Sequence, residues 1–317
     1  MSTSTLHDAL KKYVSARRAL GTQLREPAMT LMHFVEFLER EEAEFITTEL
    51  AVRWARQPDR AQPATWARRL TLVRGFAAWQ SAIDTRTEIP PRGILQARHR
   101  RKKPHIFTDQ ELEQLMAETA QLPSPTGLRA LSQVTLIGLL AATGLRPGEA
   151  LALDLHDVDL KSGILAVRKT KFGKSRFVPV HDSTRAALAH YAQRRDEALP
   201  RRGTQAFLVS ERGRRLHPST TRRTFAKVSC AIGLRTPVKG RGIGRGPRLQ
   251  DIRHTFATRR LIEWYRAGLD IELQMPKLAT YLGHVSSANT YWYIEAVPEL
   301  LQLATEESVA PQRGGAS

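Results

Sequence analysis

The spacing of apolar residues predicts a chain built mainly from helices. Two stripes recur at helical spacing within the first hundred positions: Leu31, Phe34, Val35 and Leu38, and then Trp66, Leu70, Val73, Phe76 and Ala77. Residues at such spacing share one face of a helix, so each stripe predicts a helix that buries that face in a core. The first region, from about Ser4 to Ala97, is therefore expected to consist of several helices.

A second region begins at Thr108, where Thr-Asp-Gln-Glu matches a capping box and predicts the start of a helix. An apolar helix is expected over 128–143, with Gly144 placed to end it. Two strands over 164–168 and 176–180, joined by a turn that contains Gly173, predict a small antiparallel sheet. The remaining pattern predicts helices over 182–197, 219–232, 249–267, 273–282 and 286–294.

The net charge and the composition of the chain indicate the class of partner and exclude some classes of protein. The 317 residues contain 49 lysines and arginines against 31 acids, a formal net charge of +18, which favours a polyanionic partner such as nucleic acid. Arg68, Arg69 and Arg74 beside the second stripe either face DNA or form a solvated surface. A single cysteine, Cys230, excludes an internal disulfide framework. The chain has no membrane-spanning run and no secretory signal pattern, so a cytoplasmic protein is expected.

Two basic segments stand apart from the predicted elements. Five cations precede Pro104 and mark a linker over 98–107: Arg98, Arg100, Arg101, Lys102 and Lys103. This linker is either a strap along a phosphate backbone or a merely soluble connection. The run 240–247 alternates glycine with Arg241 and Arg245, and its spacing does not match a dinucleotide fingerprint. The predicted organisation is a helical domain over 1–97, the linker, a second domain over 108–301 and a tail over 302–317.

Four short segments carry candidate chemistry, and each is weak alone. Thr-Gly-Leu-Arg-Pro-Gly-Glu at 143–149 places Arg146 at a helix junction, three residues before Glu149. Lys171 occupies the predicted turn between the two strands. Gln250 and Arg253 share a helix face in the segment 247–257. The segment 281–293 places His284 after a helix-ending glycine, and Tyr291 and Tyr293 follow it.

Taken together and in this order, the four segments resemble the tyrosine recombinase (phage integrase) family over about 108–301. The most specific element is Leu-Gly-His at 282–284 with a tyrosine nine residues after the histidine. The resemblance implies a mainly helical protein with a small antiparallel sheet. A helical, SAM-like DNA-binding domain would precede a mixed α/β catalytic domain. The C-terminal segment 289–301 resembles a subgroup found on bacterial mobile elements.

The resemblance implies a role for each matching residue. Arg146 and Arg253 match the two arginines that grip the scissile phosphate, and their paired donors suit phosphate oxygens. Lys171 matches a general acid for the departing 5′-oxygen, and His284 matches a phosphate or proton-transfer partner. Tyr293 matches the nucleophile, which forms a 3′-phosphotyrosyl bond without a cofactor, ATP or metal.

Four further positions differ from these in their expected roles. Glu149 matches an acidic position that orients the site. The family usually has histidine where this chain has Gln250, and glutamine donates a hydrogen bond but cannot shuttle a proton. His254 is expected to be structural. Tyr291 is the rival nucleophile, but two residues along a helix turn a side chain by about 200°. Only one tyrosine can therefore face the site, and family spacing favours Tyr293.

The resemblance predicts a site-specific recombinase that works on double-stranded DNA, as a tetramer with itself or with other recombinases. One alternative is a DNA-binding accessory protein with little or no catalysis, for which Gln250 is the only support. A second alternative is an enzyme similar to a type IB topoisomerase, which shares the chemistry. The target DNA sequence is not readable from the chain, because base contacts depend on side chains placed in a groove.

Overall fold

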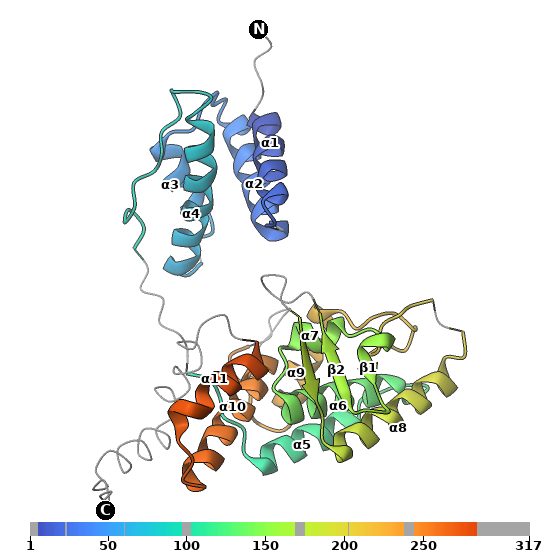
Figure 1. Ribbon diagram of the computed structural model, residues 1–317. Coiled ribbons are helices and arrows are strands. Elements are labelled where there is room, and N and C mark those ends of the chain that lie inside the picture. Colours follow the sequence, from blue (N-terminus) through green and yellow to red (C-terminus); the bar gives the residue numbers. More distant parts are fainter. Residues whose placement is uncertain are drawn as a thin grey trace, which may run out of the picture. The chain divides into compact units, whose positions relative to one another are not determined.

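The computed structural model describes residues 6–22, 24–59, 61–96, 103–168, 175–201, 203–237 and 244–283. The chain divides into two compact units, Met1–Lys102 and Lys103–Ser317. The first unit is helical, and the second combines helices with a small sheet (Figure 1). None of the helices described is both long enough and apolar enough to span a membrane.

The described part of the first unit contains four helices: α1 (Leu6–Ala19), α2 (Arg25–Arg40), α3 (Thr48–Arg56) and α4 (Pro63–Gln80). Both predicted stripes are confirmed as helices, the first in α2 and the second in α4. The stripe residues are buried, except that Trp66 is only half-buried. Phe34 and Trp54 pack with ring centroids 5.0 Å apart, which joins α2 to α3 in the core. Apolar burial of this kind is the main stabilising term for a small helical unit.

The three arginines of α4 are held by contacts within the first unit. Arg68 forms an exposed ion pair with Glu26. The Arg69 guanidinium lies 3.7 Å from the centroid of the Trp54 ring and donates to the Trp54 carbonyl. Arg74 donates to the carbonyls of Pro90 and Pro91. Of the two expectations for this set, a solvated surface describes Arg68, whereas Arg69 and Arg74 stabilise the fold.

The second unit contains a three-stranded antiparallel sheet with helices around it. Its described elements are α5 (Asp109–Ala120), α6 (Leu128–Thr143), α7 (Pro147–Ala152), the 3-10 helix η1 (Leu155–Asp157), β1 (Val158–Asp159), β2 (Ile164–Val167), β3 (Arg176–Pro179), α8 (Asp182–Ala198), α9 (Pro218–Ala231), α10 (Leu249–Arg266) and α11 (Ile271–Leu282). The strand order is β1-β2-β3, and Leu165 pairs with Val178 across β2 and β3. The two predicted strands and the helix of 182–197 are confirmed within a residue. The short elements η1 and β1 were not predicted.

Local signals in the sequence determine two helix ends near the site. Thr108 and Glu111 form the predicted capping box at the start of α5. Gly144 ends α6 with φ of 60°, a conformation that disfavours residues with a Cβ. A Cβ at Gly144 would lie 2.4 Å from Cδ1 of Phe256, so the chain also passes close to α10 at this point.

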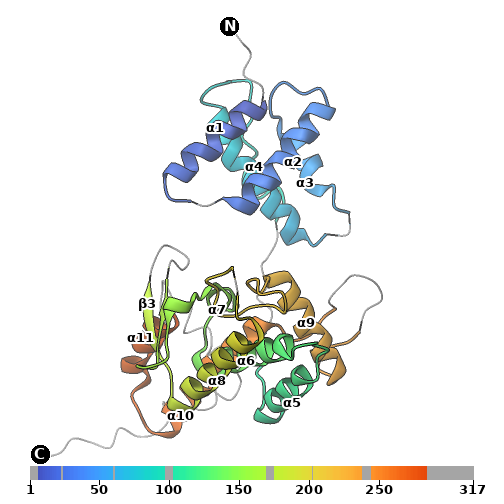
Figure 2. The same cartoon turned by 90° about the vertical axis from the view of Figure 1, so that its right-hand side faces the viewer.

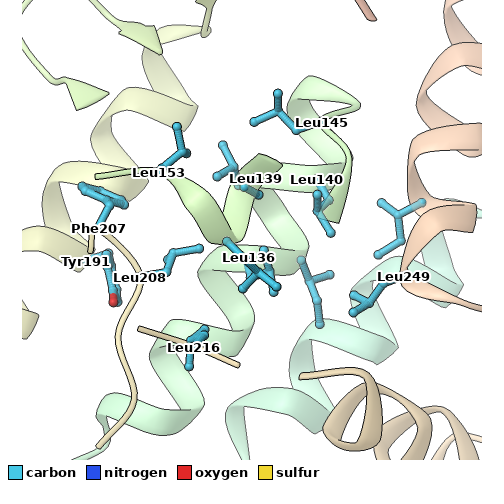
Figure 3. Packing of buried hydrophobic residues seen from close by; sticks show 14 of the residues in the cluster. Leu136, Leu139, Leu140, Leu145, Leu153, Tyr191, Phe207, Leu208, Leu216 and Leu249 are labelled. Atoms are coloured by element: carbon cyan, nitrogen blue, oxygen red, sulfur yellow. The ribbon is translucent and has the colours of Figure 1, made fainter. Parts of the chain in front are cut away.

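Helix α6 is the centre of the second unit. It contacts α5, α7, α8 and α10, and it lies beside α5 and α8 (Figure 2). Figure 3 shows Leu136, Leu139 and Leu140 of α6 pointing into a layer of buried apolar side chains from neighbouring segments. Because α6 is buried on several sides, its C-terminal end at Gly144 is held firmly against α7 and α10. That end is where the candidate site begins.

The predicted linker over 98–107 is too long at its C-terminal end. Phe107 is only 1% exposed and lies in the core of the second unit, edge-on to Phe225. Its backbone N–H donates to Thr255, and its carbonyl accepts from Arg259. The basic run ends at Lys103, and the apolar Ile106 and Phe107 that follow it already pack in the second unit.

Helices α10 and α11 pack through a separate apolar cluster, which includes Leu261, Met275 and Leu282. Helix α11 starts two residues earlier than predicted, because the Asp270 side chain accepts from the Leu273 N–H and caps it. It ends at Gly283, which has φ of 67°. The packing of α11 on α10 brings the carbonyl groups of its last turn to the end of α6.

A candidate active site for phosphate chemistry

Arg146 occupies the junction between α6 and α7. It precedes Pro147, which starts α7 as predicted. The Arg146 N–H donates to Glu149 Oε2 over 3.1 Å, and Arg146 Nη1 donates to Glu149 Oε1 over 2.7 Å. The expected pairing of these two residues on one face of the helix is therefore present, and it sets the direction of the Arg146 side chain.

Arg253 reaches the same place from α10. It is 1% exposed, and it donates to the carbonyls of Gly144 and Leu282 over 2.8 and 2.7 Å. Arg146 also donates to the Leu282 carbonyl, over 3.4 Å, and to the Gly283 carbonyl over 3.0 Å. The two arginines, 107 positions apart in the sequence, thus meet at the end of α11. Carbonyls in the last turn of a helix lack partners within the helix and carry partial negative charge, so they attract guanidinium groups.

Arg176, the first residue of β3, completes this arrangement. It donates to Glu149 Oε2 over 2.8 Å, to Glu149 Oε1 over 3.2 Å and to the Tyr281 carbonyl over 2.7 Å. Burial by itself raises the pKa of Glu149, but the hydrogen bonds and positive charges of Arg176 and Arg146 outweigh it and hold the pKa below its usual value. Glu149 is therefore a buried carboxylate shared by two arginines.

A cleft of about 770 Å³ opens beside these residues. Five arginines line it, together with Glu149 and Gln250: Arg146, Arg168, Arg222, Arg235 and Arg248. Gln250 is half-buried there, on the first turn of α10. The arginines other than Arg146 were not singled out in the sequence, because isolated arginines in helices and loops show no spacing that marks a shared surface. The excess of positive charge suits an anionic ligand.

Arg235 and His254 are held by the structure around the start of α10. Arg235 is 5% exposed and donates to the carbonyls of Gly244 and Pro247, so it anchors the segment that leads into α10. His254 is half-buried, and its desolvation, opposed by Asp251 and aided by the charges of Arg248 and Arg253, lowers its pKa to about 4. A histidine with so low a pKa is neutral at pH 7, which supports the expected structural role.

Several predicted site residues lie outside the described part of the chain: Arg98, Arg100, Arg101, Lys102, Lys171, Arg241, His284, Tyr291 and Tyr293. Lys103 and Arg245 are described, and both are exposed. Among the core candidates, the structure brings together Arg146, Glu149, Gln250 and Arg253. His284 directly follows Gly283, whose carbonyl Arg146 binds. Lys171 belongs to the connection between β2 and β3, and β3 begins with Arg176.

A polar cluster of Asp154, His156 and Asp157 lies near β1 and is the one group within the described ranges that has the spacing of metal ligands. Arg215 pairs with Asp154, and Arg168 pairs with Asp157 at 2.6 Å. Both carboxylates thus already have cationic partners, and the cluster adds nothing to the chemistry of the cleft.

Comparison with known proteins places this site in a family. The model of the phage integrase family matches residues 105–299. A putative integrase/recombinase of Sinorhizobium fredii, y4rB, is 44% identical over 95% of this chain and 96% of its own length. The tyrosine recombinase XerD of Caulobacter vibrioides is 32% identical over 75% of this chain and 73% of its own length.

The fold agrees with these relatives. A lambda integrase tetramer bound to a Holliday junction superposes with a TM-score of 0.63 at 18% identity, over 91% of this chain and 77% of that one. The expected fold class, mainly helical with a small antiparallel sheet, is confirmed. The chain belongs to the phage integrase family, and it is a tyrosine recombinase, an enzyme that cleaves and rejoins DNA by site-specific recombination.

Proposed function

We propose that this recombinase uses Tyr293 to cleave DNA at short specific sites and rejoins the strands through a 3′-phosphotyrosyl intermediate. The observation that supports the proposal most strongly is the meeting of Arg146 and Arg253 at the Leu282 carbonyl, two residues before His284. Paired guanidinium groups at one point present several N–H donors to phosphate oxygens. Such donors stabilise the negative charge that develops as phosphorus is attacked.

The remaining roles are those that the family resemblance assigns to the matching positions. Lys171 would protonate the departing 5′-oxygen, and His284 would bind the phosphate or assist proton transfer. Gln250 would donate a hydrogen bond to a phosphate oxygen from its position in the cleft. Because Arg253 is 1% exposed, its contact with phosphate requires that DNA binding uncover its guanidinium group. Glu149 would orient Arg146.

The proposed partner is double-stranded DNA, bound by a tetramer of this chain alone or with other recombinases. The lambda integrase tetramer on a Holliday junction supports such an assembly by analogy of fold. The first unit would act as a DNA-binding domain. The basic residues Arg98 to Lys103, with Arg241 and Arg245, would add phosphate contacts. The similarity to the putative integrase/recombinase y4rB supports a mobile element as the carrier of the sites. A protein that acts on bacterial DNA is expected to work in the cytoplasm.

The test uses duplex oligonucleotides from the DNA that flanks the encoding gene, each nicked beside a trial cleavage position to trap the covalent product. The wild-type protein is expected to form an adduct that survives denaturing electrophoresis. Tyr293→Phe should form none, whereas the matched Tyr291→Phe should still form it. An adduct that persists in Tyr293→Phe would show that the nucleophile is assigned wrongly.

Other outcomes separate the alternative functions. Binding to duplexes without any adduct would leave a DNA-binding accessory protein. Relaxation of supercoiled plasmid without sequence preference would favour an enzyme similar to a type IB topoisomerase. Gln250→His should keep or raise the rate of adduct formation, because histidine also donates to phosphate and can transfer a proton. Loss of cleavage in a folded Gln250→His protein would contradict the role given to this residue.

A further inference from the structure

Arg176 connects three parts of the second unit. Its side chain is 12% exposed and contacts Glu149 of α7 and the Tyr281 carbonyl in the last turn of α11. It is also the first residue of β3, which follows the connection that contains Lys171. The guanidinium group of Arg176 thus forms hydrogen bonds with the start of α7 and with the end of α11. The strand that carries it follows the connection in which Lys171 lies.

The contact with α11 is close enough to fix where the chain leaves that helix. Gly283 has φ of 67°, and a Cβ built on it would lie 2.8 Å from Arg176 Nη1. Glycine is therefore required on two grounds, its backbone conformation and the space that Arg176 occupies. The next residue is His284, so the position of Arg176 constrains the starting point of the segment that carries His284 and Tyr293.

The contact with Glu149 matters for charge. The Glu149 side chain is 8% exposed and lies between Arg146 and Arg176, at 2.7 and 2.8 Å. Two guanidinium charges and one carboxylate leave the group with a net charge of +1. Without Arg176, the carboxylate would be balanced by Arg146 alone, and that pair would be neutral. A neutral pair attracts a phosphate far less than a cation does, and the effect is large in a half-buried site.

We propose that Arg176 is a positioning residue, which neutralises Glu149 so that the charge of Arg146 remains available for the scissile phosphate. Arg176 also holds the end of α11 next to Arg146. This inference rests on the proposed function, because it assumes that Arg146 binds that phosphate. Arg176 itself is not expected to touch DNA.

A purely structural ion pair would make a different prediction from this one. If Arg176 only stabilised the fold, then removing its partner as well would not restore catalysis. If Arg176 acts by neutralising Glu149, then Glu149→Gln should restore part of the activity lost in Arg176→Gln, because the carboxylate that traps Arg146 is gone. Replacing both members of a buried ion pair by neutral groups also restores stability, so a structural role predicts recovery of the free energy of unfolding alone. Only a recovered rate of adduct formation in folded protein supports the positioning role.

The experiment measures adduct formation on the nicked duplexes at saturating protein, together with duplex affinity and urea unfolding. Arg176→Gln is expected to slow adduct formation by roughly 10-fold to 100-fold, less than the loss of a transition-state donor itself, with duplex affinity nearly unchanged. Adding Glu149→Gln should restore part of this loss and raise the rate roughly 3-fold to 10-fold above that of Arg176→Gln, where a factor of ten corresponds to one pKa unit of electrostatic interaction. Arg176→Lys, which keeps the charge, should be faster than Arg176→Gln.

Arg185→Gln is the matched control, because it removes an exposed arginine paired with Asp182 and should cleave like wild type. Adduct formation at the wild-type rate in Arg176→Gln would overturn the inference, and so would a folded double variant that is no faster than Arg176→Gln. If Arg176→Gln does not fold, the rates of adduct formation of the double variant and of Arg176→Lys are compared with wild type instead. A folded double variant that forms adduct more than about 100-fold more slowly than wild type would then contradict the inference. A wild-type protein that forms no adduct would refute the proposed function instead.

Discussion

In the first unit Arg69 stacks on Trp54 and Arg74 holds the carbonyls of Pro90 and Pro91, whereas in the second unit Arg146 and Arg222 line one cleft. Arg69 and Arg74 thus stabilise their own unit, whereas the arginines of the cleft form a surface that suits an anion. Both kinds contribute equally to the net charge of +18. The total charge therefore indicates the class of partner, but it does not show which arginines meet that partner.

The units also differ in where their charged groups lie. In the second unit, the Glu149 side chain is 8% exposed and paired with two arginines, while Arg253 is buried and His254 is half-buried. In the first unit, Glu26 and Asp84 also have lowered pKa values, but they lie near the surface and pair with Arg68 and Arg86. Because solvent screens surface pairs, substitutions of charge should affect the second unit more.

The largest effect is expected for Arg146→Gln. Loss of its guanidinium should reduce the rate of adduct formation by about 10²-fold to 10³-fold, the usual range for one transition-state donor. The free energy of unfolding should change by about 1 kcal/mol or less, because Arg146 is half-buried and its main partner, Glu149, keeps Arg176. Adduct assays and urea unfolding on the same preparations measure both. If Arg146→Gln lost as much free energy of unfolding as it lost in activation free energy for adduct formation, Arg146 would stabilise the fold as Arg69 does. The proposed difference between the arginines of the two units would then be wrong.

The next effect is expected at Gly144. Gly144→Ala places a Cβ 2.4 Å from the Phe256 ring at φ of 60°, so it should destabilise the protein by about 3 kcal/mol. Gly148→Ala is the control, since a Cβ there would meet nothing within 4 Å. Denaturant unfolding of both variants tests whether the end of α6 is as constrained as its packing indicates. Similar stability of the two variants would show that Phe256 moves aside.

Acid should destabilise the second unit first. His254 has a folded pKa of about 4, below its ordinary 6.5, so the unfolded chain binds a proton more readily as pH falls from 6.5 to 4. The free energy of unfolding should therefore fall by up to about 3 kcal/mol between pH 6.5 and pH 4. In His254→Gln, it should depend much less on pH over this range. Glu149, whose pKa is also lowered, adds a loss at more acidic pH.

Hydrogen exchange on the full chain can follow the two units separately during acidification. His190→Gln, at an exposed position of α8, is the control and should leave the pH dependence of wild type. If the amides of the first unit lost protection from exchange at a higher pH than those of the second, the prediction that acid destabilises the second unit first would be wrong.

The smallest effect is expected in the first unit. Arg69→Ala loses the stacking on Trp54 and a hydrogen bond, so it should cost about 1 to 2 kcal/mol of stability. Arg68→Ala loses only an exposed ion pair and should stay within about 0.5 kcal/mol of wild type. Thermal unfolding of the two variants measures the difference. A strong loss of duplex affinity in folded Arg69→Ala would show that this arginine also meets DNA.

Local patterns in the sequence were enough for most elements of the second unit. The capping box of Thr108 and Glu111, the end of α6 at Gly144 and the strands on either side of Lys171 all depend on neighbours within a few residues. The errors occurred where distant contacts decide. Phe107 was assigned to a linker, although its partners, Thr255 and Phe225, lie more than a hundred positions away.

The sequence by itself determined the helical stripes, the positive charge and the order of the segments that resemble a recombinase, because each is a property of nearby residues or of composition. Only the tertiary structure decided which arginines act together. Arg253 meets Gly144 and Leu282 through packing of α6, α10 and α11, and Arg176 reaches Glu149 from a strand. A guanidinium group binds whichever acceptors the fold brings to it, and no spacing along the chain encodes that choice.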